Sequence, residues 1–358
     1  MVNYIIRRLL LVVPTLIGIT MLIFFVMAIA PGGVAGSLID AEGSMRPEER
    51  RALEEYLNRR YGLNKPLHIQ YLRWCNQISP VGFEVKPDGT LGRFRLLKMP
   101  DLGRSFLRNE PVIEIVGRAL PVTLLLNLIT IPIIYGVAVT AGIYAARYRG
   151  QAFDNISSMV FLGLWSLPVM LVGVMLIGFL ANRDIVALFP EGGLHDIRAG
   201  SFAFFPRWGP DGFQRGWLLD FLWHLAAPVI CLTYGGFAFL TKLMRTSVLD
   251  NLASDFVRTA RAKGVDERAV LFSHVLRNSL LPLITVAAGI LPGLLGGSLV
   301  VEYIFGINGM GRVMVEAVFA KDRDIVLANA LVVGTVSLLS LLIADILYAV
   351  ADPRVSYE

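Results

Sequence analysis

The chain alternates between long apolar stretches and polar segments. Six apolar stretches are about 20 residues long or longer, and His224 and Asp345 are their only Asp, Glu, His, Lys or Arg residues. A helix rises about 1.5 Å per residue, and the hydrocarbon core of a bilayer is about 30 Å thick. The pattern predicts an all-α integral membrane protein with about six transmembrane helices, at Leu9–Ala30, Pro121–Ala146, Ile156–Ala181, Phe221–Thr241, Leu280–Val301 and Ile325–Ile346.

The first apolar stretch shares features with a secretory signal, because Arg7 and Arg8 precede it and small residues at 28–30 end it. Two features argue against cleavage. The stretch has 22 residues, which is longer than a typical signal core, and Pro31 follows the expected cut. We therefore expect a retained first helix.

Basic residues near the ends of the apolar stretches indicate orientation. They precede the first stretch and follow the second and the fourth: Arg7, Arg8, Arg147, Arg149, Lys242, Arg245, Arg258, Arg261, Lys263, Arg268 and Arg277. We place these segments and both termini in the cytoplasm. Residues 31–120 carry 14 basic residues on the opposite side, but segments of this length translocate largely regardless of charge. The expected organisation is 1–30 as N-terminus and first helix, 31–120 as an extracytoplasmic segment, and 121–358 as a core of five helices with a cytoplasmic loop at about 246–279.

The segments expected to be extracytoplasmic contain residues that typically begin or end helices and turns. Pro and Gly residues predict two short amphipathic helices, at 47–62 and 66–78, and the Asp-Gly turn at 88–89 predicts a small hairpin over 83–97. A second extracytoplasmic loop, at about 182–220, is rich in Gly, Pro and aromatic residues. It either faces the substrate or packs as a loop, and packing is the simpler interpretation.

The composition excludes several functions. The net charge is +5, but the 33 Lys and Arg residues are spread over many loops and form no single basic tract. Nucleic-acid binding is therefore not expected. Cys75 and Cys231 lie far apart in different kinds of segment, which implies neither a disulfide framework nor a metal site. No G-x-x-x-x-G-K-[ST] string occurs, so any ATPase must be another polypeptide.

Two other classes of membrane protein need side chains that are scarce here. An ion-coupled carrier places ionisable groups at membrane depth, and only His224 and Asp345 are available, both near helix ends. This alternative is disfavoured but stays open. An intramembrane hydrolase would need Ser166, His224 and Asp345 to converge from three helices, and it receives little weight.

The cytoplasmic loop after the fourth stretch is patterned as two helices. Ser254 is placed to cap a helix that runs to about Lys263, Gly264 supplies a left-handed residue, and Asp266 is placed to cap the next helix. Small and basic residues alternate between the caps. The first helix either docks on a partner protein or lies on anionic lipid, and the physical pattern alone favours neither.

Several strings carry a resemblance to a known family. TARAKGV at 259–265, HVLRN at 274–278 and LLP at 280–282 resemble the coupling loop of membrane subunits in bacterial ATP-binding-cassette importers of di- and oligopeptides. Further similar strings cover nearly the whole chain: RRLLLVVPTLIGITMLIFFV from Arg7, APGG at 30–33, YGLNKPLHIQYLRW at 61–74, DLGRSF at 101–106, GMGR at 309–312 and the ending DPR at 352–354.

The resemblance implies a permease subunit that forms half of a translocation path for peptides or peptide-like solutes across the bacterial inner membrane. Its implied partners are a second permease subunit, two cytoplasmic ATPase domains that hold ATP and Mg, and an extracytoplasmic substrate-binding protein; this chain itself is expected to bind no cofactor and to be no enzyme. The residues expected to couple it to the ATPase are Arg258, Thr259, Ala260, Arg261, Ala262, Lys263, Gly264, Val265, Asp266 and Glu267.

Two departures from the general importer pattern stand out. The positions of its E-A-A string are Arg258-Thr259-Ala260 here, and its final Pro is Arg277, which is the variant of the peptide importers. Residues 79–100, including the expected hairpin, look inserted relative to shorter relatives, and they are candidates for contact with the binding protein.

Overall fold

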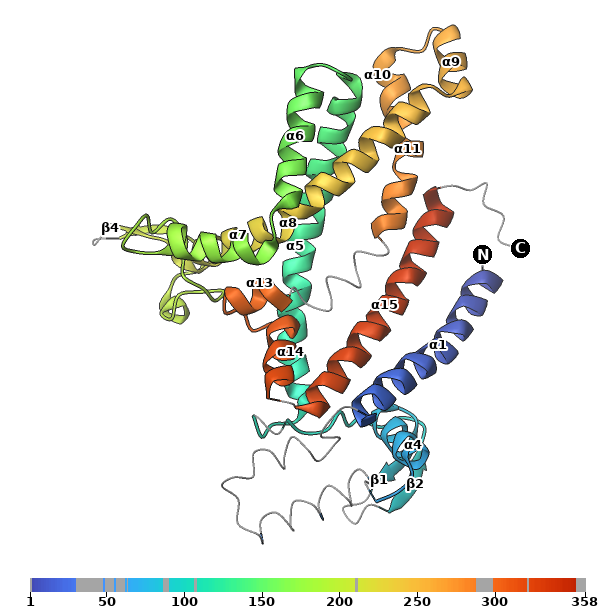
Figure 1. Cartoon of the computed structure of the whole chain (residues 1–358), viewed down its shortest axis with the longest axis vertical. Helices are drawn as coiled ribbons and strands as arrows, with labels where there is room; N and C mark the ends of the chain where they lie inside the picture. The colour runs from blue at the N-terminus through green and yellow to red at the C-terminus, as the bar shows by residue number, and fades with distance from the viewer. Residues whose placement is uncertain are drawn as a thin grey trace. The chain divides into compact units, whose positions relative to one another are not determined.

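A computed structural model describes residues 2–29, 48, 55, 62, 64–85, 90–105, 108–209, 212–287, 299–320 and 322–351. The chain is mostly helical over these residues (Figure 1). Its contacts form two compact units. The first is built mainly from Leu120–Arg312, and the second from Val2–Ala119 with Val313–Thr335.

Long helices make up most of both units. In chain order the elements up to residue 181 are α1 (Val2–Ile29), α4 (Leu67–Ile78), β1 (Gly82–Val85), β2 (Leu91–Arg95), α5 (Val112–Arg147), α6 (Ala152–Ser166), α7 (Val169–Met175) and the π-helix η2 (Leu176–Ala181). The others are the short 3-10 helix η3 (Ala199–Ser201), β3 (Arg207–Gly209), β4 (Gly212–Gln214), α8 (Gly216–Leu252), α9 (Asp255–Ala262), α10 (Glu267–Ala269), the π-helix η4 (Val270–Val275), α11 (Leu276–Ser279), α13 (Leu299–Ile304), α14 (Met310–Phe319) and α15 (Arg323–Ala351).

Among the described residues, four helices are long and apolar enough to cross a bilayer, or five if one bent pair counts as a span. The four are Val112–Arg147, Gly216–Leu252, Glu267–Ala287 and Arg323–Ile343, which contain or overlap the second, fourth, fifth and sixth predicted stretches. The first stretch lies in α1, where Leu10–Phe25 forms a shorter apolar helix. The fifth stretch continues into residues 288–298, which lie outside the described residues. The predicted count of six therefore stays a prediction.

The third predicted helix is not one straight span. The chain bends by 88° between Ala152–Ser166 and Val169–Ala181, and Figure 1 shows α7 turning away from α6. The bend lies at Leu167, whose φ of −82° and ψ of 122° are extended. A residue before proline is disfavoured in the helical region, and Pro168 has no N–H to donate. The expectation of a continuous helix over 156–181 was wrong for this reason.

The second unit contains elements that the sequence predicted between the first and second apolar stretches. α4 follows Pro66 as expected and packs against α1. The rings of Tyr71 and Phe24 meet edge to face with their centres 5.5 Å apart, and the Tyr71 and Thr20 hydroxyls are 3.0 Å apart. β1 and β2 form the predicted hairpin, with Phe83 opposite Phe94. Its turn at 86–89 and the helix predicted at 47–62 lie outside the described residues, apart from isolated positions.

The DLGRSF string has a structural role in the second unit. It precedes α5 and binds the residues that begin α15: the Ser105 hydroxyl donates to the Asp322 carboxylate at 2.6 Å, and the Arg104 N–H donates to Asp324 at 3.2 Å. Gly103 has a φ of +91°, and a Cβ there would collide with the Asp324 carboxylate. The string therefore joins the segment before α5 to the start of α15, about 220 residues later in the chain.

Candidate functional site

The predicted coupling loop forms a compact group of short helices at the end of α8 (Figure 1). Ser254 occupies the position before α9 in extended conformation, as expected of a cap, but its side chain accepts no hydrogen bond from α9. Its hydroxyl donates instead to the carbonyl of Asn251. The last carbonyls of α8 lack partners within the helix, and a nearby serine satisfies one of them. The predicted capping bond was therefore wrong, although the boundary was right.

The end of α9 follows the prediction closely. Gly264 has a φ of +76°, the Gly264 N–H donates to Arg261 at 2.9 Å, and the Val265 N–H donates to Ala260 at 3.2 Å. These two bonds form a Schellman motif, which needs a left-handed residue at this position. Asp266 then caps α10 by accepting from the Arg268 N–H at 3.0 Å. The predicted left-handed conformation of Gly264 and the predicted Asp266 cap are both confirmed.

One face of α9 packs into the chain's own core. Val257 is fully buried and Ala260 nearly so, in a cluster with Met244 and Val248 of α8 and Val270 of η4. Ala260 is thus used for packing inside the chain, whereas the sequence interpretation assigned it to an outer contact. A displacement of α9 must carry this cluster with it, because closely packed interiors deform little.

The opposite face of α9 and the turn after it are open. Of the ten predicted coupling residues, Ala260 is buried and Val265 half-buried, and eight are exposed: Arg258, Thr259, Arg261, Ala262, Lys263, Gly264, Asp266 and Glu267. Arg261 holds the Glu267 carboxylate through two contacts, of 2.7 and 3.3 Å, and Arg258 lies 3.6 Å from Asp255. The surface therefore has mixed charge and is not simply basic.

Phe256 belongs to this surface and was not among the predicted coupling residues. It is 40% exposed and lies on the same side of α9 as Thr259 and Lys263, three and seven positions later. The sequence contained a signal that Phe256 is exposed. Val257 continues the apolar pattern of the buried face, and the residue just before it points about 100° away.

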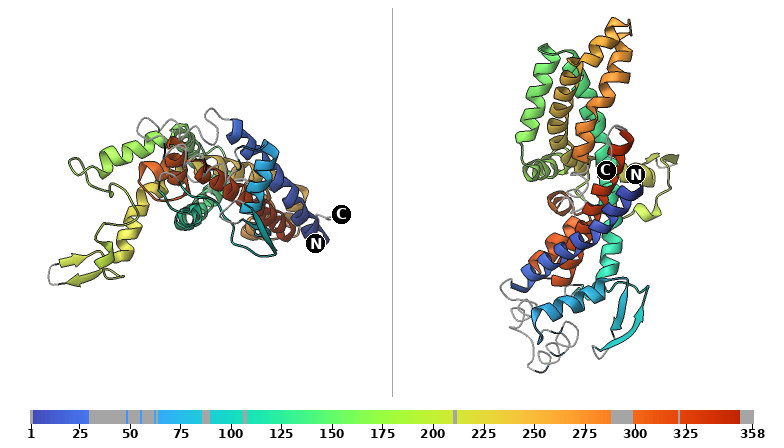
Figure 2. Two further views of the ribbon diagram at one scale, coloured as in Figure 1. Left: turned by 90° about the horizontal axis from the view of Figure 1, so that it is seen from below. Right: turned by 90° about the vertical axis from the view of Figure 1, so that its right-hand side faces the viewer.

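Polar bonds tie this group of helices to α8. The Asn251 side chain donates to the Ser247 carbonyl at 2.8 Å and to the Ser279 hydroxyl at 3.1 Å, and Ser279 is fully buried. Earlier in α8, the Arg245 guanidinium donates two hydrogen bonds to the Asp154 carboxylate of α6, at 2.6 and 2.7 Å. Figure 2 shows α6, α8 and the η4–α11 segment side by side. The sequence interpretation used Arg245 only to orient the chain and missed its pairing.

The GMGR string marks a second organised region of the first unit. Glu302 of α13 is 1% exposed, and its carboxylate accepts from the N–H groups of Gly311 at 2.7 Å and Arg312 at 3.2 Å. It also accepts from the Thr123 hydroxyl of α5 at 3.0 Å. A carboxylate at a helix N-terminus accepts hydrogen bonds from the free N–H groups there, and its negative charge interacts favourably with the positive end of the helix dipole. Glu302 thus caps α14 from another helix, and the glycines leave room for it.

The side chains considered for a hydrolase are engaged locally. The Ser166 hydroxyl donates to the Gly163 carbonyl at 2.7 Å, and His224 Nδ1 lies 2.8 Å from the Asp220 carbonyl in its own helix. The side chain of Asp345 lies outside the described residues. The described contacts give no support to a catalytic group.

The sequence matches known proteins along its whole length. A family model described as "Binding-protein-dependent transport system inner membrane component" matches residues 138–357, and one described as "Binding-prot-dependent transport system membrane comp, N-term" matches residues 1–127. The oligopeptide transport system permease protein AppB of Bacillus subtilis is 35% identical, with 100% of both chains covered. The inner membrane ABC transporter permease protein YejB of Escherichia coli O157:H7 is 32% identical, with 99% of both covered, and the oligopeptide transport system permease protein OppB of Haemophilus influenzae is 30% identical, with 100% of both covered.

Proposed function

Because the chain belongs to the family of binding-protein-dependent transport system inner membrane components, we propose that it forms half of an ATP-driven import path for peptides or peptide-like solutes. It is a multi-pass permease subunit of an ATP-binding-cassette importer in the inner membrane. The peptide class is supported by full-length relatives named as oligopeptide permeases. An ion-coupled carrier is not favoured.

The proposed partners are a second permease, two cytoplasmic ATPase domains that bind ATP and Mg, and an extracytoplasmic binding protein. The chain would run with both termini in the cytoplasm, so that α9 faces the ATPase. One observation carries this proposal. α9 has one face buried in the chain's own core, and eight of the ten expected coupling residues are exposed on the rest of α9 and in the turn after it.

The proposed mechanism treats α9 as a lever. Its open face, with Phe256, Thr259 and Ala262, would sit in a groove of one ATPase. Closure of the two ATPase domains around ATP would then move α9 as a rigid body. The cluster around Val257 and the bonds of Asn251 would pass this movement to α8.

The experiment is co-purification of the tagged chain with its native neighbours, comparing the wild type with Ala262→Glu. Ala262 is exposed on the open face, so a glutamate there should leave the chain folded and repel the partner by bulk and charge. We expect an ATPase to co-purify with the wild type and to be lost from the variant.

Ala152→Glu is the matched control. Ala152 is also exposed and begins α6, on the link that we place on the same side of the membrane, and an acid is favourable in the first turn of a helix. This variant should retain the ATPase. If no ATPase accompanied any of the three proteins while all stayed monodisperse, the proposed function would fail. Equal retention by Ala262→Glu would refute only the docking face.

A further inference from the structure

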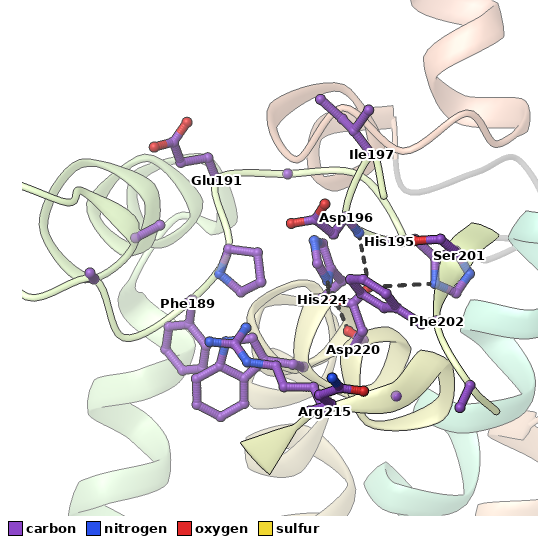
Figure 3. Close-up of a pocket in the computed structure, with 18 of the residues that line it drawn as sticks. Phe189, Glu191, His195, Asp196, Ile197, Ser201, Phe202, Arg215, Asp220 and His224 are labelled. Atoms are coloured by element: carbon purple, nitrogen blue, oxygen red, sulfur yellow. Dashed lines mark hydrogen bonds and ion pairs between the residues drawn. The ribbon is translucent and has the colours of Figure 1, made fainter. Parts of the chain in front are cut away.

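The loop between η2 and α8 lines a cavity of about 920 Å³ that is open on one side. Its walls come from residues 181–203 and from the hairpin and first turns of α8, all within the first unit (Figure 3). Backbone bonds anchor the loop: Trp217 donates to the Ala203 carbonyl at 2.7 Å, and Leu218 donates to Phe204 at 3.0 Å. The loop is packed against α8, which is the interpretation that the sequence favoured, but its packing leaves this cavity. The volume lies near the upper end of the range of about 300–1,000 Å³ for small-molecule sites.

One end of the cavity carries a buried carboxylate. Asp220 is 2% exposed, and its side chain accepts from the Asp196 N–H at 2.8 Å. Its ionic neighbours in the described part of the chain are two histidines: His224 Nδ1 at 3.5 Å and His195 Nδ1 at 3.8 Å. Figure 3 shows these three side chains converging on the cavity. A buried carboxylate needs a cation or several hydrogen bonds to offset its lost hydration.

Among the described contacts, neither histidine donates a hydrogen bond to the Asp220 carboxylate. His195 lies against Trp217 and Phe221, with ring centres 4.5 and 5.0 Å apart, and its Nδ1 is buried without a hydrogen-bond partner. Burial lowers the pKa of His195 below its usual 6.5, although Asp220 opposes this. His224 directs its Nδ1 at the Asp220 carbonyl. The carboxylate end of the cavity is therefore suited to an ammonium group.

The cavity also has a positive side. Arg215, just before α8, is exposed and lines the space. Two other arginines on the walls are engaged: Arg183 lies 3.3 Å from Glu191, and Arg207 donates to Gln214 at 2.8 Å. Phe189 and Trp223 add apolar wall. A carboxylate and a guanidinium therefore line one cavity that has apolar surface as well.

We propose that this cavity binds the free ends of a short peptide, with its α-ammonium at Asp220 and its α-carboxylate at Arg215. The inference rests on the proposed function, since it places a site for the transported class on this chain. The site would hold peptide on the side that we assign to the extracytoplasm, before it enters the path. Glu191 and Asp196 at the rim would favour the same orientation of the ammonium end.

The test measures binding of three probes to the importer complex in nanodiscs without its binding protein, by equilibrium dialysis. The probes are trialanine, N-acetyl-trialanine and trialanine amide. A hydrogen bond between charged groups contributes about a ten- to hundredfold change in affinity. The wild type should bind trialanine at least about tenfold more tightly than either blocked peptide.

Two variants separate the ends. Asp220→Asn should remove the preference for a free amino end and keep the preference for a free carboxylate, and Arg215→Gln should do the reverse. Arg198→Gln is the matched control, because this exposed arginine belongs to the same loop but does not line the cavity; it should behave as the wild type. A variant that had merely unfolded would lose both preferences, so a crossed pattern cannot come from misfolding.

The outcomes are distinguishable from those of the proposed function. If the wild-type complex imported trialanine but bound all three probes equally, or bound none at millimolar concentration, the cavity assignment would be overturned and the importer function would stand. If Arg198→Gln and Arg215→Gln had the same effect, the assignment of the carboxylate end to Arg215 would be refuted. Absence of ATP-driven import of any peptide by the complete system would remove the proposed function itself.

Discussion

Gly264 offers a direct test of the lever at α9. Its φ is +76°, and an added Cβ would meet no atom within 4 Å, so substitution introduces backbone strain without a steric collision. A left-handed conformation costs an ordinary L-residue about 1–2 kcal/mol, and more for a β-branched one. That cost lowers the population of the Schellman turn about 5- to 30-fold relative to glycine. Asparagine tolerates this conformation.

We therefore expect uptake in the order glycine, asparagine, alanine, valine. The assay is peptide uptake into proteoliposomes that contain the full importer, with ATP hydrolysis measured in parallel. Gly264→Val should lower uptake per ATP hydrolysed, because strain at the turn disturbs the angle between α9 and α10. Hydrogen exchange of residues 254–268 should rise in the same order.

Two results would contradict this reasoning. Wild-type uptake by Gly264→Val with unchanged hydrogen exchange would show that the turn does not constrain α9. Equal damage by Gly264→Asn and Gly264→Val would show that the effect comes from side-chain bulk in the docking groove and not from the backbone.

Two further predictions concern other parts of the first unit. Gly309→Ala should lower the thermal unfolding temperature in detergent, because a Cβ at this position collides with the buried Glu302 carboxylate, whereas Gly178→Ala, which meets nothing within 4 Å, should be neutral; equal melting of the two variants would argue against the Glu302 cap. Burial lowers the pKa of His195, so its neutral form stabilises the folded loop. That stability is present above about pH 6.5 and is lost as the pH falls through the lowered pKa of the folded state, since the unfolded chain then binds more protons. Tryptophan fluorescence should report this loosening, His195→Phe should abolish it, and an unchanged titration in that variant would exclude His195 as its source.

Local chemistry explains which features were predictable. Gly264 and Asp266 were read correctly because a left-handed turn and a cap depend on residues only a few positions away. The break at Pro168 was equally local, and it was missed because apolar character over 156–181 outweighed the proline signal. Ser254 shows the limit of local reasoning, because it lies between α8 and α9 and its hydroxyl can bond either helix. It donates to the Asn251 carbonyl of α8 and does not cap α9.

By itself, the sequence determined the membrane class, most of the long helices, the punctuation around α9 and the resemblance to importer subunits, because hydrophobic length and turn chemistry are properties of contiguous residues. Only the tertiary structure decided which side chains meet. Glu302 reaches Thr123, Arg245 reaches Asp154, and Asp220 lies between His195 and His224. Two of these three groupings join helices or loops distant in the chain, and the third depends on how a loop folds back on α8. Such pairings follow from packing of the whole unit, which no local pattern records.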